Sequence, residues 1–561
     1  MMSDRKRVLI VGGVAGGASC AARARRLSEE IEIVLFDRGE YVSFANCGLP
    51  YYVGEVIKKE ETLLMATPDL FEERFNIQVR LQSEVLSIDS ENKQIEVKDL
   101  SSGHTYRERY DALVLSPGAA PIKPPLPGID LPGIFTVRTI PDSRQMKEWI
   151  AKSEAKSAVV VGGGFIGLEM TENLVNLGLS VTIVEMQPQV MPLYDPEMIS
   201  PVHKHLTRKG VKLRLGETVT GFEQNGNSLS VQLRSGETES ADLVVLSVGV
   251  RPETKLAKEA GLEIGELGGI KVDEHMCTSD NSIWAVGDAV EVMDFVTGRP
   301  TLVPLAGPAN RQGRIAADVI CGRDSRFRGV QGTSAVVVFG LTISSTGLSE
   351  KTLKRLGLWD DSKHEKIYLH PNQHASYYPG AKMMTLKLIF DQEDGRIVGA
   401  QAVGEEGVEK RIDVIAFAIQ KHSTVFDLEE AELCYCPQSG SAKDAINFSG
   451  MVAANVLRED AQIAHCDDLA NSNAFLLDVR DADEFKRSRI DGAVNIPLNE
   501  LRSRIDELPK NREIMTYCLV GQRSYYANRI LVQNGFKAKN ISGGYLIYTF
   551  CKRSQARDLS S

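Results

Sequence analysis

Short apolar runs alternate with helix-length stretches in the first part of the chain. Residues 7–13 (RVLIVGG) form a β-branched run that ends in glycine, which predicts a buried strand. Residues 18–30 favour a helix and residues 31–37 a second strand, so this segment is a predicted βαβ unit. The same order recurs with strands at 157–164 and 180–185 on either side of a helix. Two such units predict two nucleotide-binding domains.

The pattern changes from about residue 330. Alternating strands such as 383–391 (MMTLKLIFD), followed by a helix that begins near Ile412, predict an α+β domain. A polar stretch at 457–473 is a predicted linker. Residues 474–561 then form a separate predicted α/β domain. The predicted fold class is therefore α/β, with two Rossmann-like domains, an α+β domain and a C-terminal α/β domain.

Composition narrows the class of protein. The chain has 561 residues, 43% hydrophobic and 25% charged, with a formal net charge of -10. These values are typical of a globular enzyme and argue against a nucleic-acid binder, which needs a basic field. The sequence shows no secretion signal and no apolar run of about 20 residues, so we expect a cytoplasmic protein that does not enter a membrane. The nine scattered cysteines predict no disulfide framework and no metal site.

The second βαβ unit carries a full G-x-G-x-x-G motif between its strand and its helix. Gly162, Gly164 and Gly167 permit a tight turn and a close approach of backbone N–H groups to a pyrophosphate. Glu185 ends the next strand, where a carboxylate accepts hydrogen bonds from a ribose 2′-hydroxyl and repels a 2′-phosphate. The motif therefore predicts NADH in preference to NADPH. A purely structural glycine turn is the alternative.

The first βαβ unit departs from that motif. Val14 replaces the middle glycine, with Gly12 and Gly17 at the ends, and Asp37 ends the second strand. We interpret this unit as an FAD site, with Asp288 near the ribityl chain of the flavin.

Residues 1 to about 455 resemble the pyridine-nucleotide disulfide oxidoreductases, specifically the coenzyme A–disulfide reductase branch. The matching motifs are GGVAGGASCAARARR, SFANCGLPY, HASYYPG (374–380), EGVEKRIDV (406–414) and SAKDAIN (441–447). The resemblance implies an FAD domain (1–150 and 266–330) interrupted by an NAD domain (151–265). It also implies a dimerisation domain (331–456) that makes a homodimer.

The resemblance adds cofactor-binding positions to those read from the motifs. For FAD the predicted residues are Gly12, Ala15, Gly16, Gly17, Asp37, Arg38, Val85, Ser116, Gly118, Gly287 and Asp288. For NAD they are Gly162, Gly164, Phe165, Ile166, Gly167, Glu185 and Gly249.

One helix face offers positive charge to an anionic ligand. Ser19, Arg23 and Arg26 stand at i, i+4 and i+7 of the first predicted helix, and guanidinium pairs well with phosphate. A solvated basic face is the alternative from spacing alone. In the resembling family this face holds coenzyme A, together with the residues that match Ser43, Asn46, Asn310 and Lys443.

A single cysteine occupies the position where flavin disulfide reductases usually have two. Val42 and Tyr52 take the reachable positions on either side of Cys47. Cys47 precedes a predicted helix, whose N-terminus lowers the pKa of a thiol. Its thiolate can attack a substrate sulfur, and a reduced flavin can resolve the adduct, so the substrate supplies the second sulfur. A buried, inert cysteine is the alternative.

The resemblance also implies that two tyrosines, Tyr377 and Tyr435, reach the active site from the partner subunit. A packing role is the alternative for each. Where the family usually has YAPPY this chain has YCPQS, which introduces Cys436 and Ser439. Cys434 and Cys436 are therefore weighed as resolving thiols, and a zinc role is disfavoured because no C-x-x-C or histidine companion is evident.

The C-terminal domain resembles a single rhodanese domain. The matching stretches are FLLDVRDADEF, RIDGAVNIPL, TYCLVGQRS and SGGY. Cys518 opens a loop that ends at Arg523, and such a loop forms an anion-binding nest in which a persulfide is stabilised. The cysteine-to-arginine spacing is one residue shorter than in cysteine phosphatases, which favours sulfur transfer. An inert domain that only binds partners is the alternative.

Together these features predict an NADH-driven flavoenzyme that reduces coenzyme A persulfide, polysulfide or coenzyme A disulfide through Cys47, while Cys518 handles sulfane sulfur. An NADH oxidase or peroxidase that cycles through a cysteine sulfenic acid is one alternative. A sulfur carrier or sulfurtransferase with the flavin core as a redox-responsive dock is the other. The sequence does not rank the three substrates, nor does it say whether sulfur passes within a chain or across the dimer.

Overall fold

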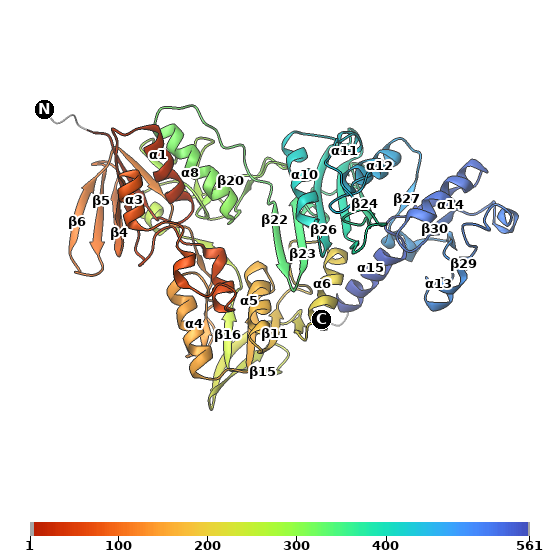
Figure 1. Ribbon diagram of the computed structural model, residues 1–561, viewed down its shortest axis with the longest axis horizontal. Coiled ribbons are helices and arrows are strands. Elements are labelled where there is room, and N and C mark those ends of the chain that lie inside the picture. The colour runs from red at the N-terminus through yellow and green to blue at the C-terminus, as the bar shows by residue number, and fades with distance from the viewer. Residues whose placement is uncertain (1–4, 559–561) are drawn as a thin grey trace. The chain divides into compact units, whose positions relative to one another are not determined.

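The chain forms two compact units in this computed structural model, which describes residues 5–558 apart from the side chains of 470–471 and 556–558. The first unit comprises the chain up to residue 184 together with 219–330. The second comprises 185–218 together with the chain from residue 331 onward. Figure 1 labels the helices and strands. The chain therefore passes between the units three times, and each unit is described by itself.

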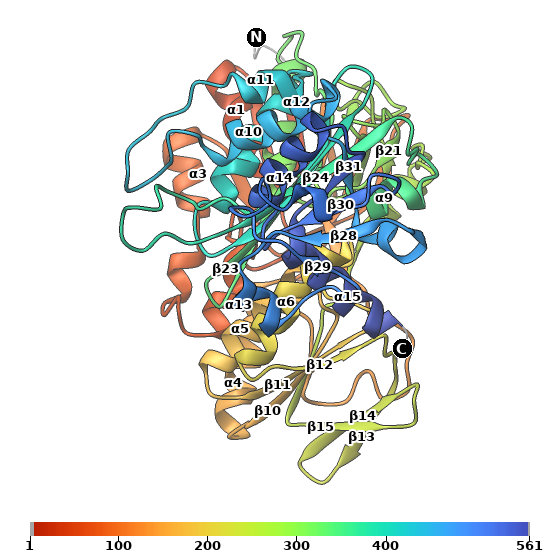
Figure 2. The ribbon, with the colours of Figure 1, turned by 90° about the vertical axis from the view of Figure 1, so that its right-hand side faces the viewer.

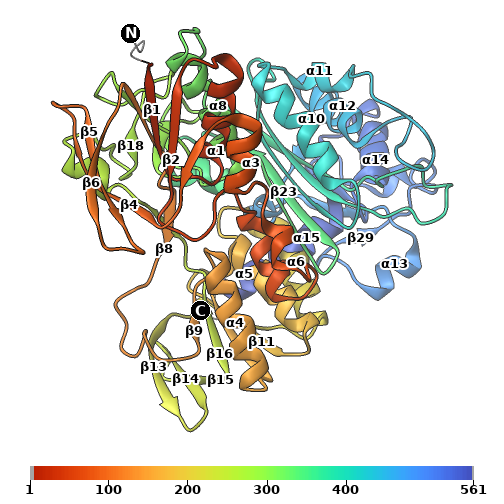
Figure 3. The same cartoon turned by 60° about the vertical axis from the view of Figure 1, so that its left-hand side comes forward.

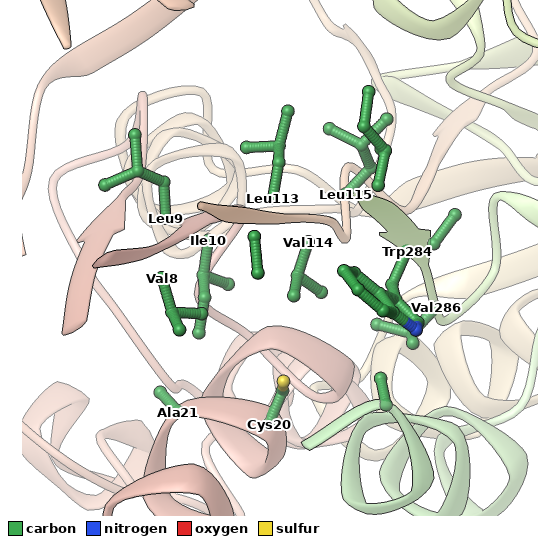
Figure 4. Packing of buried hydrophobic residues seen from close by; sticks show 14 of the residues in the cluster. Val8, Leu9, Ile10, Cys20, Ala21, Leu113, Val114, Leu115, Trp284 and Val286 are labelled. Carbon is green, nitrogen blue, oxygen red and sulfur yellow. The ribbon is translucent and has the colours of Figure 1, made fainter. Parts of the chain in front are cut away.

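A parallel sheet forms the centre of the first nucleotide-binding domain. Its strand order is β19-β7-β1-β2-β3. The strands and the helices that flank them are β1 (Arg7–Val11), α1 (Gly16–Leu27), β2 (Glu32–Phe36), α3 (Pro68–Phe75), β3 (Gln78–Arg80), β7 (Ala112–Leu115), β19 (Ile283–Ala285) and α8 (Ala306–Ile320). In Figure 4 the side chains of alternate strand residues point to opposite faces, and those of Val8 and Ile10 point toward Cys20 of α1. Burial on both faces explains why these strands are continuous apolar runs.

The second parallel sheet repeats this design. Strands β11, β10, β16 and β9 follow one another in that order, with α4 and α5 nearby (Figure 3). The bounds are β9 (Ile134–Phe135), α4 (Ile140–Lys152), β10 (Ser157–Val161), α5 (Phe165–Asn176), β11 (Ser180–Glu185) and β16 (Leu243–Leu246). Both predicted βαβ units are present, and the strand predicted at 180–185 has those limits.

Small sheets, in which most strand pairs are antiparallel, and short helices complete the first unit. They contain η1 (Asn46–Gly48), α2 (Leu49–Val53), η2 (Glu60–Leu63), β4 (Ser83–Asp89), β5 (Gln94–Asp99), β6 (Thr105–Arg109), β8 (Ala119–Pro121), β13 (Val219–Asn225), β14 (Ser228–Leu233), β15 (Thr238–Ala241), β17 (Val250–Pro252), α7 (Lys255–Glu259), β18 (Ile270–Lys271), β20 (Val290–Met293) and β21 (Pro300–Thr301).

The second unit begins its fold with an antiparallel sheet of order β22-β23-β26-β25-β24. Its elements are α6 (Pro196–Arg208), β12 (Lys212–Leu215), β22 (Ser334–Val338), β23 (Leu341–Gly347), α9 (Glu350–Arg355), β24 (His364–Leu369), β25 (Thr385–Asp391), β26 (Ile397–Gly404), α10 (Val408–Gln420), α11 (Val425–Glu429) and α12 (Ala445–Leu457). This is the predicted α+β domain, with the segment 185–218 packed against it.

A buried lysine holds that segment in place. Lys387 Nζ lies 2.9 Å from Asp195 Oδ2, 2.7 Å from Glu197 Oε1 and 2.7 Å from Glu350 Oε2, and its side chain is fully buried. Burial alone would lower the pKa of Lys387, but the carboxylates of Asp195 and Glu197 hold it well above its usual range. The lysine is therefore charged, and it neutralises acids from chain segments far apart in sequence.

A parallel sheet of order β27-β31-β30-β28-β29 forms the C-terminal module. Its elements are β27 (Ile463–Ala464), η3 (Cys466–Asn471), β28 (Phe475–Asp478), α13 (Ala482–Arg487), β29 (Val494–Asn495), η4 (Ile505–Glu507), β30 (Ile514–Tyr517), α14 (Gln522–Gln533), β31 (Ala538–Ile541) and α15 (Gly544–Asp558). The stretch 457–473, predicted as a linker, carries β27 and η3, so the sheet begins before residue 474. The edge strand β27 has only two residues, and the polar residues around it indicated a linker instead.

Helix α15 lies beside α6 (Figures 1 and 2), and the Ser554 hydroxyl donates to the Pro196 carbonyl at 3.1 Å. Cys466 and Cys551 form a disulfide, although the scattered cysteines predicted none. The two cysteines are separated by 85 residues, so no local sequence pattern predicted that they would pair. None of the helices described here is both long and apolar enough to cross a bilayer.

Candidate active sites

A cavity of ≈ 1380 Å³ opens beside the first parallel sheet. Four of the predicted FAD residues line it, namely Gly12, Asp37, Arg38 and Val85. Asp37 accepts backbone hydrogen bonds from Gly13 at 2.9 Å and Gly39 at 2.8 Å, and its burial raises its pKa. Volume and lining both fit a dinucleotide, with Asp37 at the strand end where a ribose binds.

The glycine positions between β1 and α1 leave no room for a side chain. Gly12 has a φ of +93°, and a Cβ on Gly17 would lie 1.9 Å from the Gly12 carbonyl oxygen. Gly17 N donates to Ser116 Oγ at 3.1 Å, and a Cβ on Gly16 would lie 2.8 Å from Val286. Ala15 is the N-cap of α1. The loop therefore brings the backbone of α1 close to the sheet, as pyrophosphate binding requires.

The remaining predicted FAD positions follow strands of the same sheet. Gly118 and Gly287 have φ values of +72° and +84°, which only glycine adopts readily. Gly287 N donates to Gln312 Oε1 at 2.7 Å, which fixes the turn after β19. Asp288 comes next, and burial raises the pKa of its carboxyl.

Cys47 lies in η1, directly before the five-residue helix α2, and its thiol is free. The sequence predicted a lowered thiol pKa here, and the structure corrects this. Burial, followed by the carboxylates of Glu169 and Asp288, raises the pKa of Cys47. Helix α2 is short, and two nearby acids oppose the negative charge of a thiolate.

Glu169 is the acid most coupled to this cysteine, and sequence reasoning did not find it. Burial raises the pKa of Glu169 to about 7. Its Oε1 accepts a hydrogen bond from the Tyr51 hydroxyl at 3.3 Å. Burial and the same carboxylate raise the pKa of Tyr51 to about 12. Glu169 therefore has a pKa that lets it exchange protons at neutral pH, while Tyr51 stays neutral and donates a hydrogen bond to it.

The predicted coenzyme A face of α1 is exposed in part. Ser19 Oγ hydrogen-bonds Asn310 Oδ1 of α8, which brings two predicted residues together. Arg26 is exposed, but Arg23 Nε lies 2.7 Å from Asp318 Oδ1 and is half-buried. Asp318 therefore offsets part of the positive charge that spacing alone suggested.

The loop before Cys47 has a constrained backbone. Ser43 has a φ of 50°, its N–H donates to the Gly13 carbonyl at 2.8 Å, and its own carbonyl accepts from Met65 N at 2.8 Å. Asn46 is the exposed first residue of η1. Residues 43–47 are thus tied to the glycine loop of the cavity.

The second glycine loop has the expected conformation. Gly162 has a φ of +103°, and a Cβ on Gly167 would lie 2.1 Å from the Gly162 carbonyl oxygen. Gly164 is the N-cap of α5, which begins at Phe165 and continues with the exposed Ile166. Gly249, with a φ of +112°, precedes β17.

Glu185 ends β11, as predicted. Its side chain is buried, and its Oε1 accepts from Gln187 N at 2.8 Å.

Two exposed tyrosines lie together in the second unit. The hydroxyls of Tyr377 and Tyr435 are 2.6 Å apart, and the residues are 73% and 48% exposed. Cys434 and Cys436 are exposed on the same loop, and the Ser439 hydroxyl, 2.9 Å away, lowers the pKa of Cys436. Lys443 is exposed just before α12. Large exposed aromatic side chains of this kind mark contact surfaces.

Cys518 of the C-terminal module follows β30 and is almost fully buried. Its Sγ accepts from Gly521 N at 3.2 Å and from Ser524 Oγ at 3.5 Å. Gly521 has a φ of +94° and caps α14, and this conformation turns its own backbone N–H toward the sulfur. The anion-binding nest itself stays a prediction.

Arg523 makes a two-point contact with Glu484. Its Nη1 and Nη2 lie 2.7 Å and 2.9 Å from the two carboxylate oxygens. Those hydrogen bonds raise the pKa of Arg523, and the same arginine lowers the pKa of Glu484. Glu484 thereby fixes the guanidinium beside the Cys518 loop.

Comparison with known proteins agrees with this geometry. Residues 6–310 match the family described as pyridine nucleotide-disulphide oxidoreductase, and residues 333–445 match its dimerisation domain. The chain belongs to this oxidoreductase family. Residues 463–549 match the rhodanese-like domain, which includes β27.

Solved structures match the oxidoreductase over its whole length. The crystal structure of reduced Bacillus anthracis CoADR-RHD is 47% identical, with a TM-score of 0.95 and 98% of each chain covered. A NAD-dependent persulfide reductase from A. fulgidus is 36% identical, with a TM-score of 0.89, covering 97% of this chain and 100% of the other.

Curated relatives match the oxidoreductase core. An NADH oxidase of Methanocaldococcus jannaschii is 38% identical over 79% of this chain and 97% of its own. A coenzyme A disulfide reductase of Staphylococcus haemolyticus is 32% identical over 80% of this chain and 100% of its own. The family implies FAD and NAD(H) as cofactors, and the fold class predicted from the sequence is confirmed.

The residues that sequence reasoning missed in this oxidoreductase are Tyr51, Glu169, Glu484 and Ser524. Glu169 lies in the helix after the second glycine loop, in a segment assigned to NAD alone. Its partner Tyr51 is 118 residues away. Tyr51 lies in SFANCGLPYY, Glu484 in FLLDVRDADEF and Ser524 in TYCLVGQRS, but none of these motifs specified the residue's partner.

Proposed function

We propose that this oxidoreductase uses NADH, through FAD, to reduce coenzyme A persulfide, polysulfide or coenzyme A disulfide at Cys47, and that it works as a homodimer. The observation that supports the proposal most is the single free cysteine at the start of α2, with the Tyr51–Glu169 pair beside it. An enzyme with one cysteine here needs a substrate that brings its own sulfur.

The cofactor residues fit the proposal. The cavity beside Gly12, Asp37 and Val85 suits FAD, and the glycine loop of Gly162 suits the pyrophosphate of NADH. Bound FAD supplies two-electron reduction of the adduct on Cys47. The chain contributes the glycine turns that admit the pyrophosphates and the acids that select the riboses.

Cys47 acts as the nucleophile. Its thiolate attacks one sulfur of the substrate, the sulfur–sulfur bond breaks, and a thiolate or hydrosulfide leaves. Cys47 is left in a mixed disulfide or a persulfide. Because the pKa of Glu169 is about 7, its carboxylate can hold the thiol proton at neutral pH and return it to the leaving group. Tyr51 orients that carboxylate.

Coenzyme A binds along α1 in this proposal. Ser19, Asn310 and the exposed Arg26 face the ligand. Asp318 holds Arg23 through Nε, and the other two guanidinium nitrogens of Arg23 would bind phosphate. Ser43 and Asn46 adjoin Cys47. Tyr377, Tyr435 and Lys443 act across the dimer, and the exposed hydroxyl pair supports a role other than packing.

Cys518 handles sulfane sulfur. The N–H group of Gly521 and the hydroxyl of Ser524 already point at its Sγ, so the outer sulfur of a persulfide would extend into a polarised loop. Arg523, fixed by Glu484, adds positive charge. The similarity to a persulfide reductase over the whole chain, including this module, supports persulfide as the substrate.

Anaerobic NADH oxidation with coenzyme A persulfide and with coenzyme A disulfide tests the proposal. We expect both to be reduced, with kcat/KM at least about tenfold higher for the persulfide, some 1.4 kcal/mol at the transition state. Cys47→Ser should abolish both activities, and Cys277→Ser, at a free cysteine that the proposal does not use, should leave them unchanged. Full activity in Cys47→Ser would refute the proposal.

An NADH oxidase activity is the second candidate, and the Methanocaldococcus jannaschii relative favours it. Such an enzyme would cycle Cys47 through a sulfenic acid. NADH oxidation is measured in air without a thiol substrate and, separately, under nitrogen with coenzyme A persulfide. A higher rate in air, together with oxygen consumption, would favour this candidate.

A further inference from the structure

The disulfide Cys466–Cys551 joins the two ends of the rhodanese-like module. Cys466 is the first residue of η3, directly after the edge strand β27, and Cys551 lies within α15. Cys466 is half-buried and Cys551 is 8% exposed. The bond therefore fixes the last helix of the chain to the start of the module.

Helix α15 also builds the Cys518 loop at its other end. Tyr545 N donates to the Cys518 carbonyl at 2.8 Å, and Leu546 N donates to the Leu519 carbonyl at 3.0 Å. A Cβ on Gly544 would lie 2.5 Å from that Cys518 oxygen. Cys551 comes about two turns later, roughly 10 Å along the helix. A displacement of α15 therefore changes the loop in which Cys518 lies.

Small molecules can reach the disulfide through a second cavity. This cavity of ≈ 360 Å³ is lined by both cysteines, and also by Lys354, Tyr368 and Gln555. A low-molecular-weight thiol fits this volume. Cys466 is the less buried of the two sulfurs, so it is the one that an incoming thiolate meets.

A second anchor keeps α15 near its position without the disulfide. Ser554 donates to the Pro196 carbonyl of α6, and α6 is itself held by the buried Lys387 through Asp195 and Glu197. Loss of the disulfide should therefore loosen the helix without releasing it.

We propose that Cys466–Cys551 is a thiol–disulfide exchange site that controls sulfur transfer at Cys518. The inference rests on the proposed role of Cys518. In the oxidised form α15 is fixed and the loop is ordered for persulfide binding. In the reduced form α15 loosens and the loop loses order. The ligands are small thiols and their disulfides, the class of compound on which the Cys47 site is proposed to act.

The exchange is balanced in atoms and electrons. A thiolate attacks Cys466 Sγ, the protein disulfide breaks, and Cys551 leaves as a thiolate that takes up a proton. A second thiolate attacks the substrate-derived sulfur of the mixed disulfide and frees Cys466. Two thiols are oxidised to one small disulfide, and the protein disulfide is reduced to two thiols. The reverse reaction restores the oxidised protein.

Redox titration of the whole holoenzyme tests the inference. The protein is equilibrated with mixtures of dithiothreitol and its oxidised form, alkylated, and analysed by mass spectrometry for the Cys466 and Cys551 peptides. Sulfurtransferase activity is measured in parallel aliquots that are not alkylated, after the redox buffer is removed without oxygen. We expect activity to fall about tenfold as the pair becomes reduced, because positioning of Cys518 is lost. NADH turnover at Cys47 should stay unchanged.

Variants separate this effect from reduction at other cysteines. Cys466→Ser should show the low activity at every redox ratio, while Cys277→Ser should respond as the natural chain does. Hydrogen exchange of residues 518–524 gives a readout that does not need activity. Faster exchange in the reduced form and in Cys466→Ser is expected. Equal exchange in both forms overturns the inference, whereas absent sulfur transfer with altered exchange overturns only the proposed role of Cys518.

Discussion

The Tyr51 hydroxyl donates to Glu169 Oε1 at 3.3 Å, and Glu169 in turn raises the pKa of the Cys47 thiol. This places a half-buried acid with a pKa of about 7 close to the cysteine proposed to attack coenzyme A substrates. The arrangement couples proton exchange at neutral pH to the charge of Cys47.

Replacing Glu169→Gln should make Cys47 more reactive toward alkylation. The change removes a negative charge that disfavours the thiolate, so the pKa of Cys47 should fall and the rate of iodoacetamide labelling at pH 8 should rise roughly threefold. Turnover should nevertheless drop, because no carboxylate remains to hold the proton. Labelling is followed at Cys47 by mass spectrometry, with Glu148→Gln, at an exposed acid of α4, as the control. An unchanged labelling rate would show that Glu169 does not act on this cysteine.

The same acid gives stability a specific pH dependence. Its pKa rises from 4.5 to about 7 on folding, so the folded state binds more protons than the unfolded state between these values. The stabilisation is complete below pH 4.5 and is lost as pH rises through 7. Glu169→Gln should remove this component, which chemical denaturation of both proteins between pH 5 and 8 would reveal as a smaller loss of stability with pH. Parallel curves for the two proteins would contradict the assignment.

Glu484 should act as a positioning residue for Arg523. The two-point contact fixes the guanidinium plane, which Glu484→Gln weakens and Glu484→Asp keeps in part. We expect sulfurtransferase kcat/KM to fall about tenfold in Glu484→Gln and to recover in Glu484→Asp. Glu500→Gln, which removes an exposed partner of Arg504, serves as the control. A purely structural role would lower thermal stability in both Glu484 variants without that recovery.

Tyr435→Phe should show whether the Tyr435 hydroxyl assists the reaction or only packs at the surface. The side chain is 48% exposed and its hydroxyl meets Tyr377, so its loss should leave Tm nearly unchanged. Turnover of coenzyme A substrates at Cys47 should fall about tenfold if the hydroxyl assists the reaction. Tyr526→Phe, at an exposed tyrosine of α14, is the matched control. Equal kinetics in both variants would assign Tyr435 to the surface alone.

Lys387→Ala should destabilise the second unit. Its ammonium is fully buried among Asp195, Glu197 and Glu350, and removing it leaves uncompensated carboxylates in the interior. Losses of about 3–5 kcal/mol are typical of such changes. Lys363→Ala, at an exposed lysine 3.8 Å from Asp391, should cost less than about 1 kcal/mol. Urea unfolding compares the two, and similar losses in both variants would refute the prediction.

Local sequence patterns predicted the parts of the site that lie close together along the chain. The conformation of Gly162 and the position of Glu185 follow from a strand, a turn and a helix in succession, each with its own local signal. The loop of Cys518 is likewise built from residues 518–524. These features could be predicted because their physical causes lie within one supersecondary unit.

Features that depend on distant residues could not be predicted in this way. The ion pair of Arg23 with Asp318 joins residues 295 positions apart, and it changed the charge expected of the α1 face. The pKa of Cys47 is raised first by burial and then by the carboxylates of Glu169 and Asp288, which lie far from it in sequence. A helix N-terminus next to a cysteine indicated the opposite direction, because spacing reveals nearby helices but not the carboxylates that fold against them.

The rhodanese-like module is joined to the dimerisation sheet by the backbone as well as by side chains. Tyr368 N donates to Ser542 Oγ at 3.0 Å, and His370 Nε2 lies 3.2 Å from the Gly543 carbonyl, in a setting whose burial lowers the pKa of His370 to about 4. Truncating the gene after α12 would therefore strip hydrogen-bond partners from the sheet and uncover the flank of α6. A shortened enzyme would need compensating surface substitutions. The rhodanese-like module should therefore be expressed and engineered together with the oxidoreductase core.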